Sequence, residues 1–332
     1  MIDIIMPHYR EPWEVGRKFF QMLDLQRGIN FEGIRVILVH DGTEPFPDEF
    51  FADRPYRVDQ ITIDHAGVSA ARNEGLRNAT AEWVMFCDFD DMFAHAYAMQ
   101  DILNVLPAPG YDLLWMNFFT EDRAKDGSMR YNVHGMNWVH IHGKLYRRQH
   151  LLESNLWFDE DIDFNEDSLF NAMLDTFTAP KRTGQIKTQF PAYIWCFNPD
   201  SITTTLGSRE RSIIGQYKRN KKVTEVFRAR MPFERYLMMI ARTVSDAYYA
   251  LNADDLSPAL MEMQDDFKAW FAKHKVLYDM VEDFERYTTM NVSRNERMTA
   301  DREERERFGA ESVNAFRNDR SLEEWLDELE VE

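Results

Sequence analysis

The sequence has 332 residues, more than one small core usually needs, so we expect two domains or one domain with a large appendage. Hydrophobic residues make up 44% of the chain and aromatic residues 14%, which excludes a mainly disordered protein. The net charge of −18 disfavours general binding to nucleic acid or to anionic membrane surfaces.

Two features of the sequence bear on the compartment in which the protein works. The two cysteines, Cys87 and Cys196, lie inside apolar runs and predict buried free thiols, which fit a reducing compartment. The first residues already have the pattern of a strand, and no window approaches the roughly 20 apolar residues of a membrane span. We therefore expect a cytoplasmic protein without a membrane span.

The first half of the chain alternates short apolar runs with amphipathic segments. Strands are predicted at residues 2–6 (ended by Pro7), 34–40, 56–63 and 83–87, and helices at 12–25, 69–79 and 96–106. Strands that are apolar on both faces and alternate with helices predict an α/β fold with a mainly parallel sheet, flanked by helices. In such a sheet the functional site lies beyond the carboxyl ends of the strands. Polar runs follow three of these ends, at residues 8–11, 41–43 and 88–91.

The last third of the chain has a different character. Apolar residues recur at helical spacing over 233–251 and 267–284, which predicts an all-helical C-terminal domain at 233–332. Six Lys and Arg residues in 207–222 indicate a basic connecting segment at 207–232, after a first domain at 1–206. The apolar helix faces need partners, either the first domain or a second copy of the chain, so a homo-oligomer is one expectation. Trp325 and Leu329 form a short amphipathic pattern that predicts local docking of the acidic tail.

The acidic run Asp88-Phe89-Asp90-Asp91 is the strongest chemical signal, and it follows a predicted strand. Three carboxylates this close repel one another unless a cation or hydrogen-bond donors neutralise them. Alternation along an extended chain would place Asp88 and Asp90 on one side, where both could bind one ion. Hard oxygen ligands suit Mg²⁺ or Mn²⁺. An acidic turn that caps the next helix explains the same run equally well, and the motif alone leaves both interpretations open.

Five blocks in a fixed order resemble glycosyltransferase family two. They are IDIIMPHYR (2–10), VILVHDGT (36–43), GVSAARNEGLRNATAEWVMFCDFDDMF (67–93), NEDSLFNAML (165–174) and PAYIWCFNPDSITT (191–204). The resemblance covers roughly residues 1–205 and implies a GT-A fold and an inverting glycosyltransferase. Such an enzyme moves a sugar from a nucleoside-diphosphate sugar, here UDP-linked rather than GDP-linked, to a hydroxyl of a glycan or glycoconjugate. The alternatives are a non-catalytic GT-A-like module that binds nucleotide or glycan, a nucleotidyltransferase, and a glycosyltransferase that acts on modified nucleic-acid bases.

By position, the resemblance also implies a donor-binding site, made of Pro7, Tyr9, Asp41, Arg72, Asp88 and Ser201. Tyr9, at the corner that Pro7 begins, would line or stack on the nucleobase, and Asp41 would accept a hydrogen bond from the imide N–H of the base. Arg72 would either pair with the diphosphate or hold Asp41 and Asp88 in place. Asp88 would touch the ribose or the metal, and Ser201 would approach the pyrophosphate.

The resemblance implies a divalent cofactor, Mn²⁺ or Mg²⁺, with Asp90 as the direct ligand and Asp88 beside it. Asp91 would ligate the metal or bind the acceptor. His140 and His142 alternate as on one face of a strand, and His142 could supply a further ligand. Packing or acceptor binding is the commoner role for a histidine in such a stretch.

Glu166 and Asp167 begin a predicted amphipathic helix. Carboxylates are stabilised there by the helix dipole, so simple capping explains them without a catalytic role. The family resemblance implies that Asp167 is the general base, which takes the proton of the attacking hydroxyl. Glu166 would then hold the acceptor, and the choice of base between the two stays open at this point.

Overall fold

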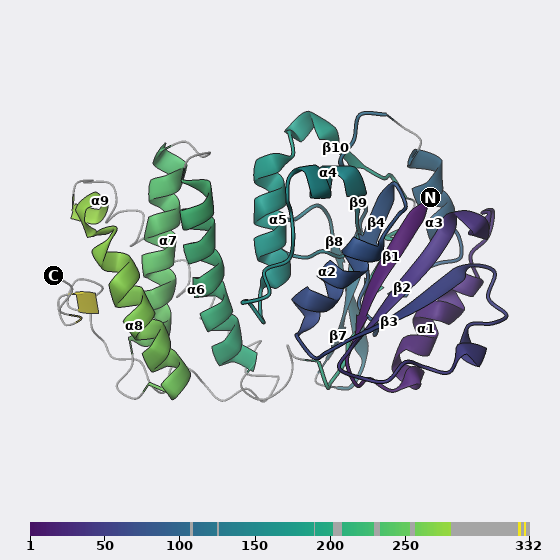
Figure 1. Ribbon diagram of the computed structural model, residues 1–332, viewed down its shortest axis with the longest axis horizontal. Helices are drawn as coiled ribbons and strands as arrows, with labels where there is room; N and C mark the ends of the chain where they lie inside the picture. The colour runs from purple at the N-terminus through teal and green to yellow at the C-terminus, as the bar shows by residue number, and fades with distance from the viewer. Residues whose placement is uncertain are drawn as a thin grey trace. The chain divides into compact units, whose positions relative to one another are not determined.

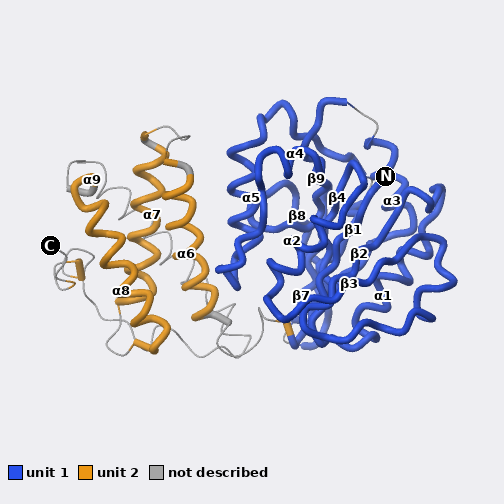
Figure 2. Tube along the Cα trace, viewed as in Figure 1, with its two compact units in different colours: residues 1–200 blue, residues 201–332 orange. Residues whose placement is uncertain are grey.

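The computed structural model describes residues 1–106, 109–124, 126–188, 190–201, 208–228, 233–252 and 256–279, together with 325, 326 and 329. The chain divides into two compact units, Met1–Asp200 and Ser201–Glu332 (Figure 2). Each unit contains a buried hydrophobic cluster of its own.

A seven-stranded sheet forms the centre of the first unit (Figure 1). Its strands, in spatial order, are β10 (Thr183–Gln185), β6 (Leu113–Trp115), β9 (Lys144–Arg147), β4 (Trp83–Phe86), β1 (Ile2–His8), β2 (Ile34–Asp41) and β3 (Arg57–Ile63). The strands from β4 to β3 are parallel, while β9 is antiparallel to both of its neighbours. This mixed sheet with helices packed against it confirms the predicted α/β class.

Helices cover both faces of the sheet because alternate strand residues are apolar on each side. Ile4 packs in the cluster that includes α1 (Trp13–Asp24) and α3 (Ala98–Val105). Its neighbour Ile5 packs on the opposite face, with α2 (Val68–Asn78), α4 (Arg148–Glu153) and α5 (Glu166–Phe177). Helices α1 and α3 therefore cover one face of the sheet, and α2, α4 and α5 cover the other. Single-turn 3₁₀ helices lie at Phe31–Gly33, Asp48–Phe50 and Pro180–Arg182.

The structure corrects the predicted end of the first strand. β1 continues through Pro7, which pairs with Val39, and ends at His8. On its other side β1 pairs with β4 only as far as Ile5. Pro7 lies beyond this pairing, so its lack of an N–H group costs no hydrogen bond to β4. The extension carries the strand end closer to Tyr9.

A second, four-stranded sheet was not anticipated from the sequence. Its strands, in spatial order, are β5 (Met92–Phe93), β11 (Tyr193–Trp195), β7 (Phe118–Arg123) and β8 (Met129–His134). β5 and β11 are only two and three residues long, and β8 is exposed over most of its length. None of these three strands therefore gives a clear periodic pattern in the sequence. This sheet connects the acidic turn after β4 with β11.

The second unit is helical in its described part, with α6 (Ser208–Phe227), α7 (Phe233–Leu251), α8 (Pro258–Ala272) and α9 (Lys275–Asp279). The expected connecting segment at 207–232 is largely occupied by α6, because Tyr217 belongs to the same core as Ile240 and Phe267. Trp325 stacks on Phe267 with ring centroids 5.5 Å apart, which confirms local docking of the tail. Residues 280–324 of the expected helical domain lie outside the described residues. No helix in the described part of the chain is long and apolar enough to cross a membrane.

Candidate active site

The carboxyl ends of β1, β2 and β4 meet at one edge of the large sheet, because these strands are parallel neighbours. His8, Asp41 and the turn that begins at Cys87 therefore lie side by side. His8 and His40 share a hydrogen bond of 2.8 Å between their Nδ1 atoms, and both rings are buried. The predicted clustering of polar residues at strand ends follows directly from this topology.

Asp41 lies buried at the end of β2 and receives three hydrogen bonds from the segment after β3. The backbone N–H of Ala66 donates to Oδ1 at 2.7 Å, and that of Gly67 donates to Oδ2 at 3.0 Å. The imidazole of His65 lies 2.9 Å from Oδ2, and its ring stacks on Tyr9 with centroids 4.3 Å apart. Tyr9, expected to stack on a base, thus lies beside Asp41 with an exposed fraction of 36%.

Arg72, the fifth residue of α2, joins two acidic segments. Its two terminal nitrogens donate to Glu166 Oε1 at 2.7 Å and to Asp88 Oδ1 at 2.8 Å. The guanidinium is buried and lies over the ring of Phe158. Arg72 thus contacts Asp88, as expected if it holds that residue in place, whereas Asp41 is held by the 65–67 segment and not by Arg72.

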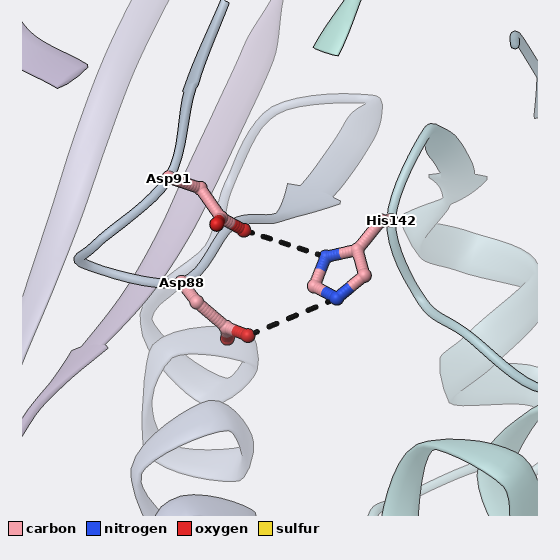
Figure 3. A group of neighbouring side chains, drawn as sticks. All are labelled: Asp88, Asp91 and His142. Atoms are coloured by element: carbon pink, nitrogen blue, oxygen red, sulfur yellow. Dashed lines mark ion pairs between the residues drawn. The ribbon is translucent and has the colours of Figure 1, made fainter. Parts of the chain in front are cut away.

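Three potential metal ligands converge beside this ion pair: Asp88, Asp91 and His142 (Figure 3). Their ligand atoms all lie within 4.8 Å of one another. The Nδ1 atom of His142 is 3.6 Å from Asp91 Oδ2, and its Nε2 atom is 3.9 Å from Asp88 Oδ2. These separations are too long for hydrogen bonds. The two separations involve opposite nitrogens of one ring, and a single ion could bind only one of these nitrogens together with the neighbouring carboxylates.

The chemistry of this cluster fits a divalent cation. Burial lowers the pKa of His142 to about 3, so the ring is neutral and can donate a lone pair. Its Nδ1 atom is buried and has no hydrogen-bond partner. Burial, followed by the charges of Asp90 and Asp88, raises the pKa of Asp91 well above its usual range. Burial would also raise the pKa of Asp88, but the charge and hydrogen bond of Arg72 lower that pKa below its usual range.

The turn that bears His142 depends on the next residue. Gly143 has a φ of +65°, and a Cβ atom there would lie 2.7 Å from the carbonyl oxygen of Met116. Only glycine therefore allows the chain to turn into β9 at this point. The His142 ring is then held by stacking on Trp195, with centroids 5.2 Å apart.

Asp90 and Asp91 have different surroundings. Asp90, expected as the direct ligand, lies outside the group of three and accepts a hydrogen bond from Asn198 Nδ2 at 2.8 Å. Asp91 is fully buried and accepts from the hydroxyl of Tyr193 at 2.6 Å and from the backbone N–H of Cys196 at 2.9 Å. Asp91 therefore ties β11 of the small sheet to the acidic turn.

Asp167 is the second residue of α5 and follows Glu166, the partner of Arg72. Its Oδ1 atom accepts from the backbone N–H of Ser168 at 2.6 Å. Burial, followed by the charge of Glu166, raises the pKa of Asp167 to about 7, although Arg72 opposes the shift. A carboxyl with a pKa near neutrality is suited to take a proton from a hydroxyl group. Glu166 itself is engaged by Arg72.

Ser201, the remaining predicted donor residue, is the first residue of the second unit, so it is not described together with the sheet edge of the first unit. His65 and Tyr193 contact the site but were not expected there from the sequence. His65 could have been found by extending the strand-end rule to the third strand, which ends at Ile63. For Tyr193 there was no such signal, since its contact with Asp91 spans 102 positions of the chain.

A sheet of this topology with acidic turns at its carboxyl edge is typical of the GT-A fold. Residues 3–170 match the profile of the family described as Glycosyl transferase family 2. The chain belongs to that family.

Relatives with curated descriptions are similar over part of the chain. It is 27% identical over 226 residues to the "Uncharacterized glycosyltransferase EpsJ" of Bacillus subtilis, a match that covers 61% of this chain and 63% of the relative. It is 29% identical over 189 residues to the "Minor teichoic acid biosynthesis protein GgaA" of the same organism, covering 51% and 42%. The chain thus spans less than two thirds of the length of either relative.

Solved structures share the fold at low sequence identity. S. aureus TarS (residues 1–349) in complex with UDP-GlcNAc has a TM-score of 0.63 at 15% identity, covering 89% of this chain and 91% of that one. The mannosyltransferase PcManGT from Pyrobaculum calidifontis, in complex with GDP-Man and Mn²⁺, has a TM-score of 0.50 at 14% identity, covering 87% and 83%. These likenesses show the GT-A fold.

Proposed function

We propose that this chain transfers a sugar, with inversion, from a UDP-linked nucleotide sugar to a hydroxyl group of a glycan or glycoconjugate. The observation that carries the proposal is the convergence of three groups at one sheet edge. Asp41 lies beside Tyr9 at the proposed nucleobase site, Asp88 lies in a cluster that suits a cation, and the pKa of Asp167 is raised to about 7. Each group matches one requirement of the reaction: donor recognition, charge neutralisation and proton removal.

The donor half of the site centres on Tyr9 and Asp41. The half-exposed ring of Tyr9 offers a face on which a base can stack, and Asp41 offers a carboxylate to the imide N–H of uracil. The structures of TarS bound to UDP and to UDP-GlcNAc support a uridine nucleotide. The complex of PcManGT with GDP-Man makes a guanosine donor the alternative for the test.

Asp88, Asp91 and His142 would hold a divalent cation, and the Mn²⁺ in the PcManGT complex supports this assignment. A cation bound there would supply positive charge opposite the leaving diphosphate. Arg72 contributes by fixing Asp88 and Glu166, and it adds a buried positive charge to the same region.

Asp167 would act as the general base. Its ionised carboxylate accepts the proton of the acceptor hydroxyl as the hydroxyl oxygen attacks the anomeric carbon. The bond between that carbon and the diphosphate breaks on the opposite side, so the configuration inverts. Glu166, held by Arg72, is placed next to the base to orient the acceptor.

A panel of UDP- and GDP-linked sugars with Mn²⁺ tests the proposal by measuring the diphosphate released with and without acceptor mixtures. We expect one UDP-sugar to be turned over. Asp167→Asn should keep donor affinity but lower kcat by about 10²-fold or more, because the amide cannot accept the proton. Asp163→Asn is the matched control, since Asp163 is exposed and lies four residues earlier. Turnover by Asp167→Asn at the rate of the control would contradict the assignment of the base.

A further inference from the structure

His65 lies on the segment between β3 and α2, beside the proposed nucleobase site. Its imidazole stacks on the ring of Tyr9, with centroids 4.3 Å apart and an interplanar angle of 13°. The Nδ1 atom of the same imidazole lies 2.9 Å from Asp41 Oδ2. The carboxylate already accepts two backbone N–H groups and is an acceptor here as well, so Nδ1 carries the hydrogen and donates it. One planar ring thus both stacks on Tyr9 and donates an N–H group to Asp41.

These are the two contacts that the proposed function gives to uracil, which would stack on Tyr9 and donate its imide N–H to Asp41. Arg10 also lies over the Tyr9 ring, with its Cζ atom 4.8 Å from the centroid. The hydrogen bond to Asp41 distinguishes the two neighbours, because the position that touches both Tyr9 and Asp41 is taken by the His65 ring. A base that makes both contacts therefore replaces that ring.

The main chain around His65 is fixed, whereas its side chain can turn away. The backbone N–H groups of Ala66 and Gly67 donate to Asp41 at 2.7 and 3.0 Å. The side chain of His65 is 56% exposed, so its ring can rotate into solvent without moving this backbone. Asp41 then keeps its two backbone hydrogen bonds, and its Oδ2 atom gains room for one new donor.

The exchange of one ring for another lowers the affinity for a nucleotide. A base that enters must replace a hydrogen bond and a ring stack that the chain already makes, so only the difference between the two sets of contacts adds to binding. The diphosphate group has neither a ring nor an N–H donor, so it has no part in the exchange. The effect of His65 is therefore confined to ligands that carry a base.

We propose that His65 is a further donor-site residue that exchanges with the nucleobase: its imidazole leaves Tyr9 and Asp41 when the base binds and returns when the nucleoside diphosphate departs. The inference rests on the proposed nucleobase site at Tyr9 and Asp41. His65 is then a competitor of the base, which weakens the binding of the nucleoside diphosphate product and favours its release.

Calorimetric titration of His65→Ala with UDP at saturating Mn²⁺ tests the exchange. We expect the Kd for UDP to fall about three- to ten-fold, because the base no longer has an imidazole to displace. His65→Phe keeps the ring stack and His65→Asn keeps an N–H donor, so each should give a smaller gain in affinity. Inorganic diphosphate with Mn²⁺ should bind equally to all of these proteins. Thr62→Ala, at an exposed residue of β3, is the matched control and should bind UDP like the wild type.

An unchanged or higher Kd for UDP in His65→Ala would overturn the exchange, because a residue that supports the base loses affinity when it is removed. Failure of the proposed nucleobase site has a different signature. In the His65→Ala background, Tyr9→Ala should weaken UDP binding about five-fold or more, since it removes the base stack. If Tyr9→Ala has no effect there, the nucleobase site lies elsewhere and the proposed donor site is wrong. If Tyr9→Ala weakens binding but His65→Ala gives no gain over the wild type, only the role of His65 is wrong.

Discussion

At the scale of single residues, the pKa values of the site's carboxylates depend on burial and on the few positively charged side chains near them. Burial raises the pKa of Asp167 and that of Asp91, whereas Arg72 outweighs burial at Asp88 and lowers the pKa there. The pKa values of neighbouring carboxylates at this edge are therefore shifted in opposite directions. Such separation allows one group to accept a proton while another stays ionised to bind charge.

The pH dependence of the reaction follows from the pKa of Asp167. The base works in its ionised form, and the protonated fraction grows as pH falls through about 7. We therefore expect kcat/KM at saturating Mn²⁺ to be level above pH 8 and to fall about ten-fold per pH unit below 6.5. A profile that stays level down to pH 5 would show that the base has an ordinary carboxyl pKa.

Substitution of His142 tests whether the cluster of Asp88, Asp91 and His142 binds a metal ion. His142→Asn removes the imidazole whose Nδ1 atom has no protein partner, so the Kd for Mn²⁺ should rise at least ten-fold. The stacked Trp195 offers a direct readout, because its fluorescence should change on Mn²⁺ binding in the wild type. His134→Asn is the control, since His134 stacks on the nearby Phe118 but lies outside the cluster. Equal Mn²⁺ affinity in all three proteins would remove His142 from the site.

At the scale of elements, the close approach of α1 to the acidic turn shapes the edge of the sheet. A Cβ atom on Gly16 would lie 2.2 Å from Phe89 Cζ. The Phe89 ring is buried and stacks on Phe46, with centroids 5.5 Å apart. Because Phe89 lies between Asp88 and Asp90 in the chain, a shift of its ring must also move the carboxylates.

Gly16→Ala should therefore lower the free energy of unfolding by about 1–3 kcal/mol, the usual cost of overpacking, and weaken donor binding. Urea denaturation and calorimetric titration with UDP and Mn²⁺ measure the two effects. Gly33→Ala is the matched control, because a Cβ atom there has no neighbour within 4 Å. If Gly16→Ala is as stable as Gly33→Ala, the contact with Phe89 does not constrain this turn.

At the scale of the whole molecule, the two units have separate cores and the family match ends within the first. The described edge residues from Tyr9 to Asp167 all belong to Met1–Asp200. The second unit has its own core, which includes Phe267 and Trp325. This division predicts that donor recognition belongs to the first unit, while the helical unit serves the acceptor or assembly.

A chain truncated after residue 201 should thus fold and bind UDP with Mn²⁺ at an affinity within a few-fold of the full chain, and should lose transfer to acceptor. Calorimetric titration measures the first property and product formation the second. A soluble truncated chain that fails to bind UDP would assign part of the donor site to the helical unit.

The sequence by itself determined the α/β class, the family and the acidic turn, since strand periodicity and the five blocks are local patterns. It also indicated the docking of Trp325, because a short amphipathic pattern identifies residues that need a core. Helix α6 was assigned to a connecting segment, because its six Lys and Arg residues concealed the apolar positions that pack against α7.

Only the tertiary structure decided which acidic residues lie close enough together to hold one ion. Alternation in an extended strand placed Asp88 with Asp90, but the chain leaves β4 at Phe86 and turns, which brings Asp88 to Asp91 and His142 instead. Asp91 and its partner Tyr193 are 102 positions apart, and Arg72, which binds Asp88, is 94 positions from its other partner Glu166. Periodicity reports neighbours within an element, whereas contacts of this separation depend on how elements pack, so no local pattern could have placed Tyr193 beside Asp91.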